Sequence, residues 1–307
     1  IVILILYIGS YVYKNHDDFP YYHLTYALNL SENQFIVGTG NFSHGFRTFS
    51  SLFYFHSILF MPFIDYNLFH IGTFLILVFF NLIILSKIFN EIEKNNHRFL
   101  AIFSLLAFIF VNIVFYRIGE HGTDRSAQIL LLLIFLFFFE LVYFEYNEKI
   151  FFQKLYILLV LVFLASSMKV LYYLYLILIL VIFFKKKIFK KFLIKKNFLI
   201  IFFVSLSLFF NLITNYLNTG CFLYPSEKTC IIKTKWSIPK KEVKQMAIHY
   251  EWWAKAGGGP GYSSEISKEI YVKNFIWLNN WIERHFKPKI LDPLIGILFI
   301  GIFMYFT

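Results

Sequence analysis

Apolar residues run along most of this chain in long blocks that short polar segments separate, a pattern typical of a protein that crosses a membrane several times. A helix needs about 20 apolar residues to cross the roughly 30 Å hydrocarbon layer of a bilayer. The pattern therefore predicts an all-α polytopic integral membrane protein with about eight transmembrane helices. They are expected at about 1–13, 66–86, 99–116, 126–144, 151–167, 170–184, 197–217 and 290–307.

The apolar stretch 151–184 is too long for one span. At 1.5 Å per residue it would form a helix of about 50 Å. We therefore predict two shorter helices joined near Ser166, Ser167 and Lys169. Both ends of the chain lie inside apolar runs, so we interpret the chain as truncated at both ends, with 290–307 as the start of a further transmembrane helix.

The composition excludes two other classes of protein. Hydrophobic residues make up 59% of the chain, against roughly 45–50% in a soluble domain. Charged residues make up 15%, against about 25%. The formal net charge of +11 does not indicate nucleic-acid binding, because the basic residues are sorted by loop rather than spread over one surface. We expect no nucleic acid as a partner.

The distribution of Lys and Arg predicts the orientation. The loops at 87–98, 145–154 and 185–196 hold twelve of them, and the alternate loops at 14–50, 117–125 and 166–169 hold five. By the positive-inside rule, the first set is cytoplasmic in a multi-pass protein of the cell's inner membrane. Residues 1–217 then form the transmembrane domain, with 14–50 as its first outer loop.

The polar segment 218–289 falls on the outer, periplasmic side by alternation and predicts a small outer helical cap. Helical stretches are expected in it at about 239–255 and 263–285. Its two cysteines, Cys221 and Cys230, have eight residues between them. A disulfide across that spacing is plausible in an oxidising compartment, although two separate thiols would fit the sequence as well.

The most informative polar stretch follows the first span and reads His16-Asp17-Asp18-Phe19-Pro20-Tyr21-Tyr22-His23. Paired carboxylates at the outer lip of a helix can take a proton from an incoming hydroxyl or hold a divalent cation. The alternative is a solvated turn that ends the helix. The tyrosines that follow predict a helix lying at head-group depth, which would keep the acids at the membrane surface.

This stretch resembles the outer loop of the GT-C superfamily of membrane glycosyltransferases, among them the bacterial relatives of dolichyl-phosphate-mannose-protein mannosyltransferases. Many bacterial members read Asp-Glu-x-Tyr-Tyr there, and one of the acids is the catalytic base. Here Asp17-Asp18-Phe19-Pro20-Tyr21-Tyr22 has Asp in place of Glu and one extra residue before the tyrosines. The resemblance implies a GT-C-like fold and a catalytic role for Asp17 or Asp18, and it leaves open which of the two acts.

Further polar residues on the same side could bind a substrate or the phosphate of a lipid. The loop between 116 and 126 carries two arginines around a glycine-rich acidic turn, and a guanidinium matches phosphate oxygens. An isolated Lys169 in an apolar stretch either snorkels to phospholipid or binds a donor phosphate. The candidate binding residues are His23, His44, Arg47, Glu120, His121, Asp124, Arg125 and Lys169.

The function implied by the resemblance is transfer of a sugar, with inversion, from a polyprenyl-phosphate donor to a glycan or lipid acceptor at the outer face of the membrane. Asp17 and Asp18 would also be the ligands of any Mg²⁺ or Mn²⁺ cofactor, and membrane lipid is the remaining partner. The alternative is a multi-pass transporter or channel. That class calls for broken, charged helices near the midplane and an inverted repeat, and the sequence shows no convincing internal repeat.

Overall fold

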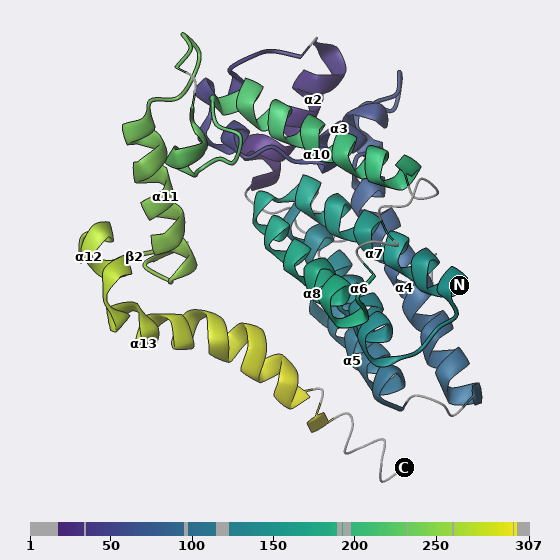
Figure 1. The fold of residues 1–307 in the computed structure, drawn as a ribbon. Helices are drawn as coiled ribbons and strands as arrows, with labels where there is room; N and C mark the ends of the chain where they lie inside the picture. The colour runs from purple at the N-terminus through teal and green to yellow at the C-terminus, as the bar shows by residue number, and fades with distance from the viewer. Residues whose placement is uncertain are drawn as a thin grey trace.

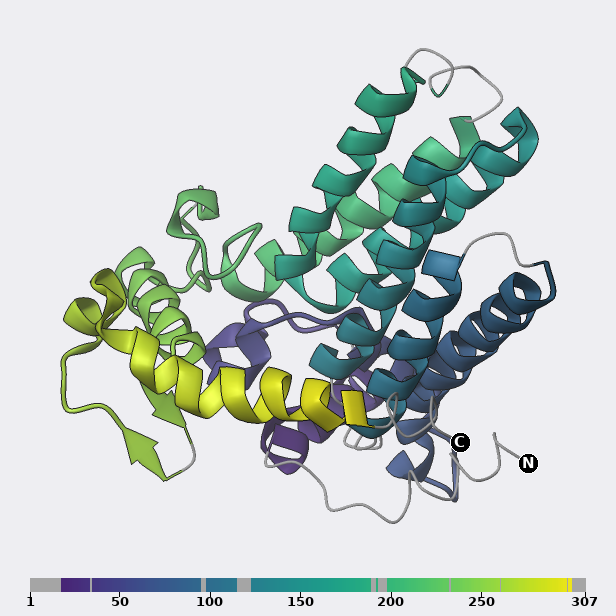
Figure 2. The ribbon, with the colours of Figure 1, turned by 90° about the horizontal axis from the view of Figure 1, so that it is seen from below.

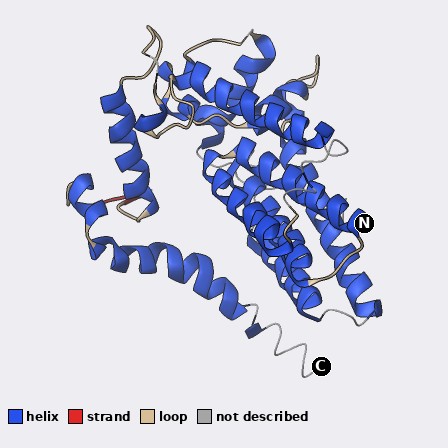
Figure 3. Ribbon diagram, in the orientation of Figure 1, coloured by secondary structure: helices blue, strands red, loops and turns tan. Residues whose placement is uncertain are grey.

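The computed structural model describes most of the chain as helix, with one two-stranded hairpin in the described part (Figure 3). A bundle of long helices forms one part of the molecule, and a smaller outer group of helices leads from it to the C-terminal end (Figure 1). The described residues are 18–33, 35–94, 98–114, 123–188, 192, 198–231, 233–259, 261–296 and 298–299.

Four helices in the described part of the chain are long and apolar enough to cross a membrane, which supports the predicted multi-pass membrane class. The candidate spans are Tyr66–Asn90, Thr123–Tyr143, Glu148–Met168 and Leu199–Thr219. They correspond to η4 (Tyr66–Leu68) with α4 (His70–Lys94), and to α6 (Thr123–Tyr143), α7 (Glu148–Met168) and α10 (Phe198–Thr219).

The predicted count of eight spans is not confirmed. Helix α8 (Leu176–Lys186) has 11 residues and is shorter than a usual span, and α5 (Arg98–Val114) adjoins residues outside the described part at both ends. The expected span 1–13 and the end of 290–307 lie outside the described residues.

The bundle is built around α6. This helix packs along α7 and against α4, and α5 packs along α4. Leu133 and Ile134 of α6 and Leu158 and Val162 of α7 have no exposed surface. Only 11% of the apolar window of α10 is buried, so most of its surface is left for lipid.

The predicted break in the stretch 151–184 is confirmed. Helix α7 ends at Met168, Lys169 is extended, and a 3₁₀ segment η6 (Val170–Tyr175) leads into α8. The hydroxyls of Ser166 and Ser167 donate to the carbonyls of Val162 and Leu164 at 2.7 and 2.8 Å, and such local bonds compete with the regular helix.

A buried carboxylate joins three helices at the opposite end of the bundle from Lys169. Glu140 of α6 is 1% exposed and forms ion pairs with Lys87 of α4 and Lys154 of α7. The two ammonium groups also lie over the ring of Phe137, at 5.7 and 5.9 Å from its centroid. A charge in this position has to be paired, because an isolated carboxylate away from water costs several kcal/mol.

Two short-helix groups lie outside the bundle. The described part of the predicted first outer loop, 14–50, folds with residues 51–58 as a group of short helices. Its elements are η1 (Phe19–His23), α2 (Leu24–Glu32), η2 (Thr39–Asn41), η3 (His44–Arg47) and α3 (Ser51–Ile58).

The predicted cap follows α10. Its elements are η8 (Glu227–Thr229), α11 (Lys240–Ala254), β1 (Gly258–Gly259), β2 (Tyr262–Ser263), α12 (Lys268–Lys273), η9 (Phe275–Trp277), α13 (Leu278–Trp281) and η10 (Ile282–Leu291). Helix α11 confirms the stretch expected at 239–255. The stretch expected at 263–285 is divided, because the backbone at Asn274 is extended.

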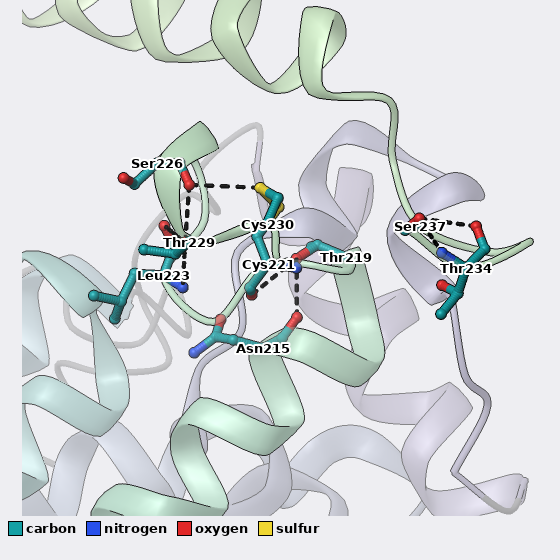
Figure 4. The surroundings of a disulfide bond; sticks show 9 residues. All are labelled: Asn215, Thr219, Cys221, Leu223, Ser226, Thr229, Cys230, Thr234 and Ser237. Atoms are coloured by element: carbon teal, nitrogen blue, oxygen red, sulfur yellow. Dashed lines mark hydrogen bonds between the residues drawn. A yellow bond between two sulfur atoms is a disulfide. The ribbon is translucent and has the colours of Figure 1, made fainter. Parts of the chain in front are cut away.

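The disulfide between Cys221 and Cys230 is present and lies at the start of the cap. Figure 4 shows it beside the end of α10, where the Thr219 hydroxyl donates to the Asn215 carbonyl at 2.9 Å and accepts from the Cys221 amide at 3.2 Å. Both cysteines are buried, together with Tyr224, Ile238 and Val243. The disulfide therefore belongs to a small second core that fixes the cap to α10.

We predict that Glu140→Ala destabilises the bundle by about 3–5 kcal/mol, because it leaves two ammonium groups in an apolar setting. The exposed Glu145, at the end of the same helix, is the matched control, and Glu145→Ala should cost under about 0.5 kcal/mol. Thermal unfolding in detergent measures both. The triple variant Lys87→Met, Glu140→Leu, Lys154→Met should recover most of the loss, and equal losses for Glu140→Ala and Glu145→Ala would contradict the assigned role.

Candidate functional site

Asp18 stands immediately before η1, and the chain turns into helix there because Pro20 occupies the first turn, where its missing amide hydrogen is not needed. The Tyr22 hydroxyl donates a hydrogen bond to the Asp18 carboxylate. Burial raises the pKa of Tyr22, and the carboxylates of Asp18 and Asp124 raise it further. Tyr22 is therefore a neutral phenol within electrostatic reach of two carboxylates from distant parts of the chain.

Gly45 allows Tyr22 to occupy this place. A Cβ built on Gly45 would lie 2.3 Å from Cγ of Tyr22, so any larger residue in η3 would displace the ring. The Ser43 side chain caps this short helix by accepting from the Gly45 amide at 3.3 Å. The segment η3, which contains the candidate binding residues His44 and Arg47, therefore packs against Tyr22 through Gly45.

An ion pair between Lys169 and Asp124 includes the second carboxylate that acts on Tyr22. Asp124 is in the first turn of α6 and Lys169 follows the last residue of α7, so the pair joins the start of one span to the end of the next. The Lys169 side chain is 37% exposed and that of Asp124 is 59% exposed, which leaves both accessible to a ligand. The Ser51 and Ser167 hydroxyls, 2.7 Å apart, add a contact between α3 and α7 beside it.

Arg47 connects the first outer loop to the cap. Its Nε donates to the Gly40 carbonyl at 3.0 Å, and its guanidinium forms an ion pair with Glu242 of α11 at 2.6 Å and lies within electrostatic reach of Tyr224. The Arg47 side chain is 13% exposed. Arg47 therefore holds the cap to the first loop, whereas the sequence suggested that it binds a phosphate.

Two histidines face each other where the cap meets the loop. The rings of His44 and His249 lie 6.3 Å apart, and His44 also contacts Tyr250 at 5.5 Å. Burial and then the Arg47 charge lower the pKa of His44, and burial and then Lys268 lower that of His249. Both imidazoles are neutral at pH 7, and Nε2 of His44 is buried without a hydrogen-bond partner.

His23 lies deeper than the other candidates. It is 4% exposed and packs between Tyr22, at 4.3 Å between ring centroids, and Phe53, at 5.4 Å. His56 is next to it and fully buried, and burial lowers the pKa of His56 to about 3. The histidines here are part of an aromatic core under the site, so His23 supports the position of Tyr22.

The remaining candidates divide into two groups. Arg125 follows Asp124 on α6 and is partly buried. Asp17, Glu120 and His121 lie outside the described residues. Within the described part of the chain, no three His, Cys, Asp or Glu side chains are grouped so that they could hold a metal ion.

Among the sequence-based candidates, the structure brings Asp18 and Asp124 within electrostatic reach of Tyr22, pairs Lys169 with Asp124, and puts His44 and Arg47 where the loop meets the cap. The cap adds partners that the sequence did not indicate, and these are Tyr224, Glu242, His249 and Tyr250. The only local signal for them was the aromatic run at the end of an otherwise polar helix, 249–253. Chemically, the arrangement offers a carboxylate base, an accessible cation and aromatic surface on the outer side of the spans.

These features define a nearly all-helical, multi-pass membrane protein whose polar site lies between a first outer loop and a disulfide-bonded cap. Comparison with protein families then places the chain. Residues 1–307 match the model of the domain of unknown function DUF8201, and the chain belongs to that family. No curated protein and no solved structure matches it.

We predict that Arg47→Ala loosens the cap without unfolding the bundle. Loss of a charged hydrogen bond of about 1.5 kcal/mol corresponds to about tenfold faster amide exchange in α11 if that helix exchanges through opening of the cap. Hydrogen–deuterium exchange of residues 240–254 measures this. Lys244→Ala, which removes an exposed cation of the same helix, is the control and should leave exchange unchanged; identical exchange in both variants would contradict the role of Arg47.

Proposed function

We propose that this protein is a membrane glycosyltransferase that moves a sugar from a polyprenyl-phosphate donor to a glycan or lipid acceptor at the outer face of the membrane. The observation that carries the proposal is that Tyr22 is within electrostatic reach of the carboxylates of Asp18 and Asp124, and that Asp124 is paired with Lys169. These residues come from three distant segments and share the outer side of the bundle. The resemblance of 17–22 to the acidic outer loop of GT-C enzymes supports the same assignment.

In the proposed reaction, Asp18 or its neighbour Asp17 accepts the proton of the acceptor hydroxyl. The hydroxyl oxygen attacks the anomeric carbon from the side opposite the lipid phosphate, and the bond between that carbon and the phosphate oxygen breaks. The anomeric configuration inverts. The bonding electrons leave with the polyprenyl phosphate, and an accessible cation stabilises the charge that develops there.

Lys169 is the residue assigned to the departing phosphate, with Arg125 nearby on α6. In the absence of substrate Lys169 is paired with Asp124, and a phosphate oxygen would take the place of that carboxylate. The hydrogen bond from Tyr22 orients the Asp18 carboxylate toward the site. The neutral His44 and His249 and the ring of Tyr250 form a cap-side wall suited to a sugar, which binds through its apolar face and its hydroxyls.

The location follows from the charge distribution. The cluster of lysines at 185–196 favours the cytoplasmic side, so the site faces outward in the inner membrane. A polyprenyl phosphate in the outer leaflet reaches such a site from the lipid. The disulfide of the cap suits that compartment, since such bonds persist in oxidising surroundings.

We predict that Asp18→Asn lowers transfer by about 10²–10⁴-fold if Asp18 is the base, because the amide keeps the shape of the side chain but cannot accept a proton. Transfer of labelled sugar from polyprenyl phosphate in isolated membranes measures it. Glu32 is an exposed carboxylate of the same loop, and Glu32→Gln, which removes its charge, should leave the rate unchanged. Full activity in Asp17→Asn, Asp18→Asn and the double variant would refute the proposal.

A second prediction concerns the Lys169 and Asp124 pair. A partly exposed ion pair contributes about 0–1 kcal/mol to stability, so Lys169→Ala should fold normally and raise KM for the lipid donor more than it lowers kcat. The exchanged variant Lys169→Asp, Asp124→Lys restores an ion pair with the charges reversed. If Lys169 binds phosphate, this variant keeps its stability and loses donor use; recovery of normal KM would show that the pair is only structural.

A further inference from the structure

The helix that leaves the cap has an apolar face that nothing in the described chain covers. Segments α13 and η10 form one helix over 278–291 that continues to 296, and its apolar residues recur every four positions, at Leu278, Ile282, Phe286, Ile290 and Leu294. In an α-helix with 3.6 residues per turn, such a repeat drifts by about 40° at each step. Residues Ile282–Leu291 are wound more widely, as a π-helix, and this keeps the repeat closer to one side.

The polar side of this helix is tied to the cap. Asn280 donates to the hydroxyls of Tyr262 and Tyr271 at 2.9 and 3.2 Å. The Arg284 guanidinium lies 3.6 Å from the ring centroid of Tyr262, and His285 hydrogen-bonds the backbone of Trp253. These contacts set the rotation of the helix about its axis, so the apolar side is turned away from the cap.

The apolar side is exposed. Leu278, Phe286, Ile290 and Leu294 have 40, 36, 41 and 55% of their surface accessible. Figures 1 and 2 show that the helix extends away from α11 and is not aligned with the bundle helices. An apolar face of this length is not stable in water and marks a surface that binds a protein or a membrane.

The residues around the face indicate what covers it. Trp277 and Trp281 lie at its N-terminal end, and Lys287 and Lys289 flank it beyond the middle. Amphipathic helices that lie in a bilayer interface combine these features, with aromatic and aliphatic residues on one side and basic residues at the edge. The helix carries Arg284, Lys287 and Lys289 against Glu283 and Asp292, so it has a net positive charge, which anionic head groups would neutralise and a second copy would not.

We propose that the helix 278–296 lies in the head-group region of the outer leaflet, with its apolar face in the acyl chains and its lysines on anionic lipid. The cap is then held at the membrane surface by lipid as well as by Arg47. The helix also leads directly into the apolar run 290–307. This assignment stands independently of any transfer activity.

The proposal is tested with nitroxide labels on single introduced cysteines. The two native cysteines form the disulfide, so each new one is the reactive thiol. Phe286→Cys and Ile290→Cys report the apolar face, and Asn279→Cys and Glu283→Cys, also exposed, are the matched controls. The labelled full chain is reconstituted in vesicles of three parts phosphatidylcholine to one part phosphatidylglycerol, and relaxation by oxygen is compared with relaxation by a water-soluble nickel complex.

The expected result is a high ratio of oxygen to nickel accessibility at 286 and 290 and a low ratio at 279 and 283. Equal exposure of all four labels to nickel would overturn the proposal, because the helix would then lie in water. Protection of 286 and 290 from both reagents would overturn it in favour of a protein partner or a second copy. Vesicles of pure phosphatidylcholine should lower the ratio at 286 and 290, and an unchanged ratio would exclude the part assigned to anionic lipid.

A second measurement uses unlabelled protein, so it does not depend on the folding of the cysteine variants. Lipids brominated near the head group should quench the fluorescence of the native protein through Trp277 and Trp281. The variant Trp277→Phe, Trp281→Phe should lose most of this quenching, while the matched cap variant Trp236→Phe, Trp253→Phe should keep it. The opposite pattern would place the cap near Trp236 and Trp253, rather than this helix, in the membrane.

Discussion

The outer half of the molecule depends on the point where α7 stops and Lys169 meets Asp124. A lysine cannot remain in the middle of an apolar span without compensation, and here the helix ends one residue before it. The ion pair then ties the end of one span to the start of another. The Asp124 carboxylate of this junction raises the pKa of the Tyr22 phenol, which hydrogen-bonds Asp18, so the polar residues of the candidate site are near the ends of these two spans.

Local patterns in the sequence predicted much of this arrangement. The break near Ser166 and Ser167, the membrane class, the α11 helix and the disulfide follow from hydropathy, helix length and compartment, which act over short stretches of chain. The number of spans was harder to obtain, because the apolar content of 170–184 does not reveal that its α-helix, α8, is short and follows a 3₁₀ segment. Length and winding depend on neighbours, which hydropathy does not encode.

For the candidate site too, the sequence indicated single residues but not their contacts with distant parts of the chain. Asp18, Asp124 and Lys169 could be chosen from the sequence because isolated charges at the ends of apolar runs are unusual. Their contact through Tyr22 could not, and neither could the docking of α11. Arg47 looked like a phosphate ligand, yet Glu242, 195 positions later, takes its guanidinium. Such pairings arise from the path of the whole chain, and a single sequence gives no sign of them.

The Glu140 triad has a consequence for how the protein enters the membrane. Glu140 is the fourth residue from the C-terminal end of α6 and is 1% exposed, and an unpaired carboxylate away from water costs several kcal/mol, so α6 alone is poorly suited to lateral release into lipid. One of its counter-charges, Lys87, precedes it in the chain, and the other, Lys154, is synthesised after it. The Glu140 carboxylate of α6 is therefore paired with both lysines only after α7 has been synthesised. This favours release of α6 and α7 into the lipid together, as a hairpin beside α4. The order of synthesis thus contributes to the assembly of the bundle.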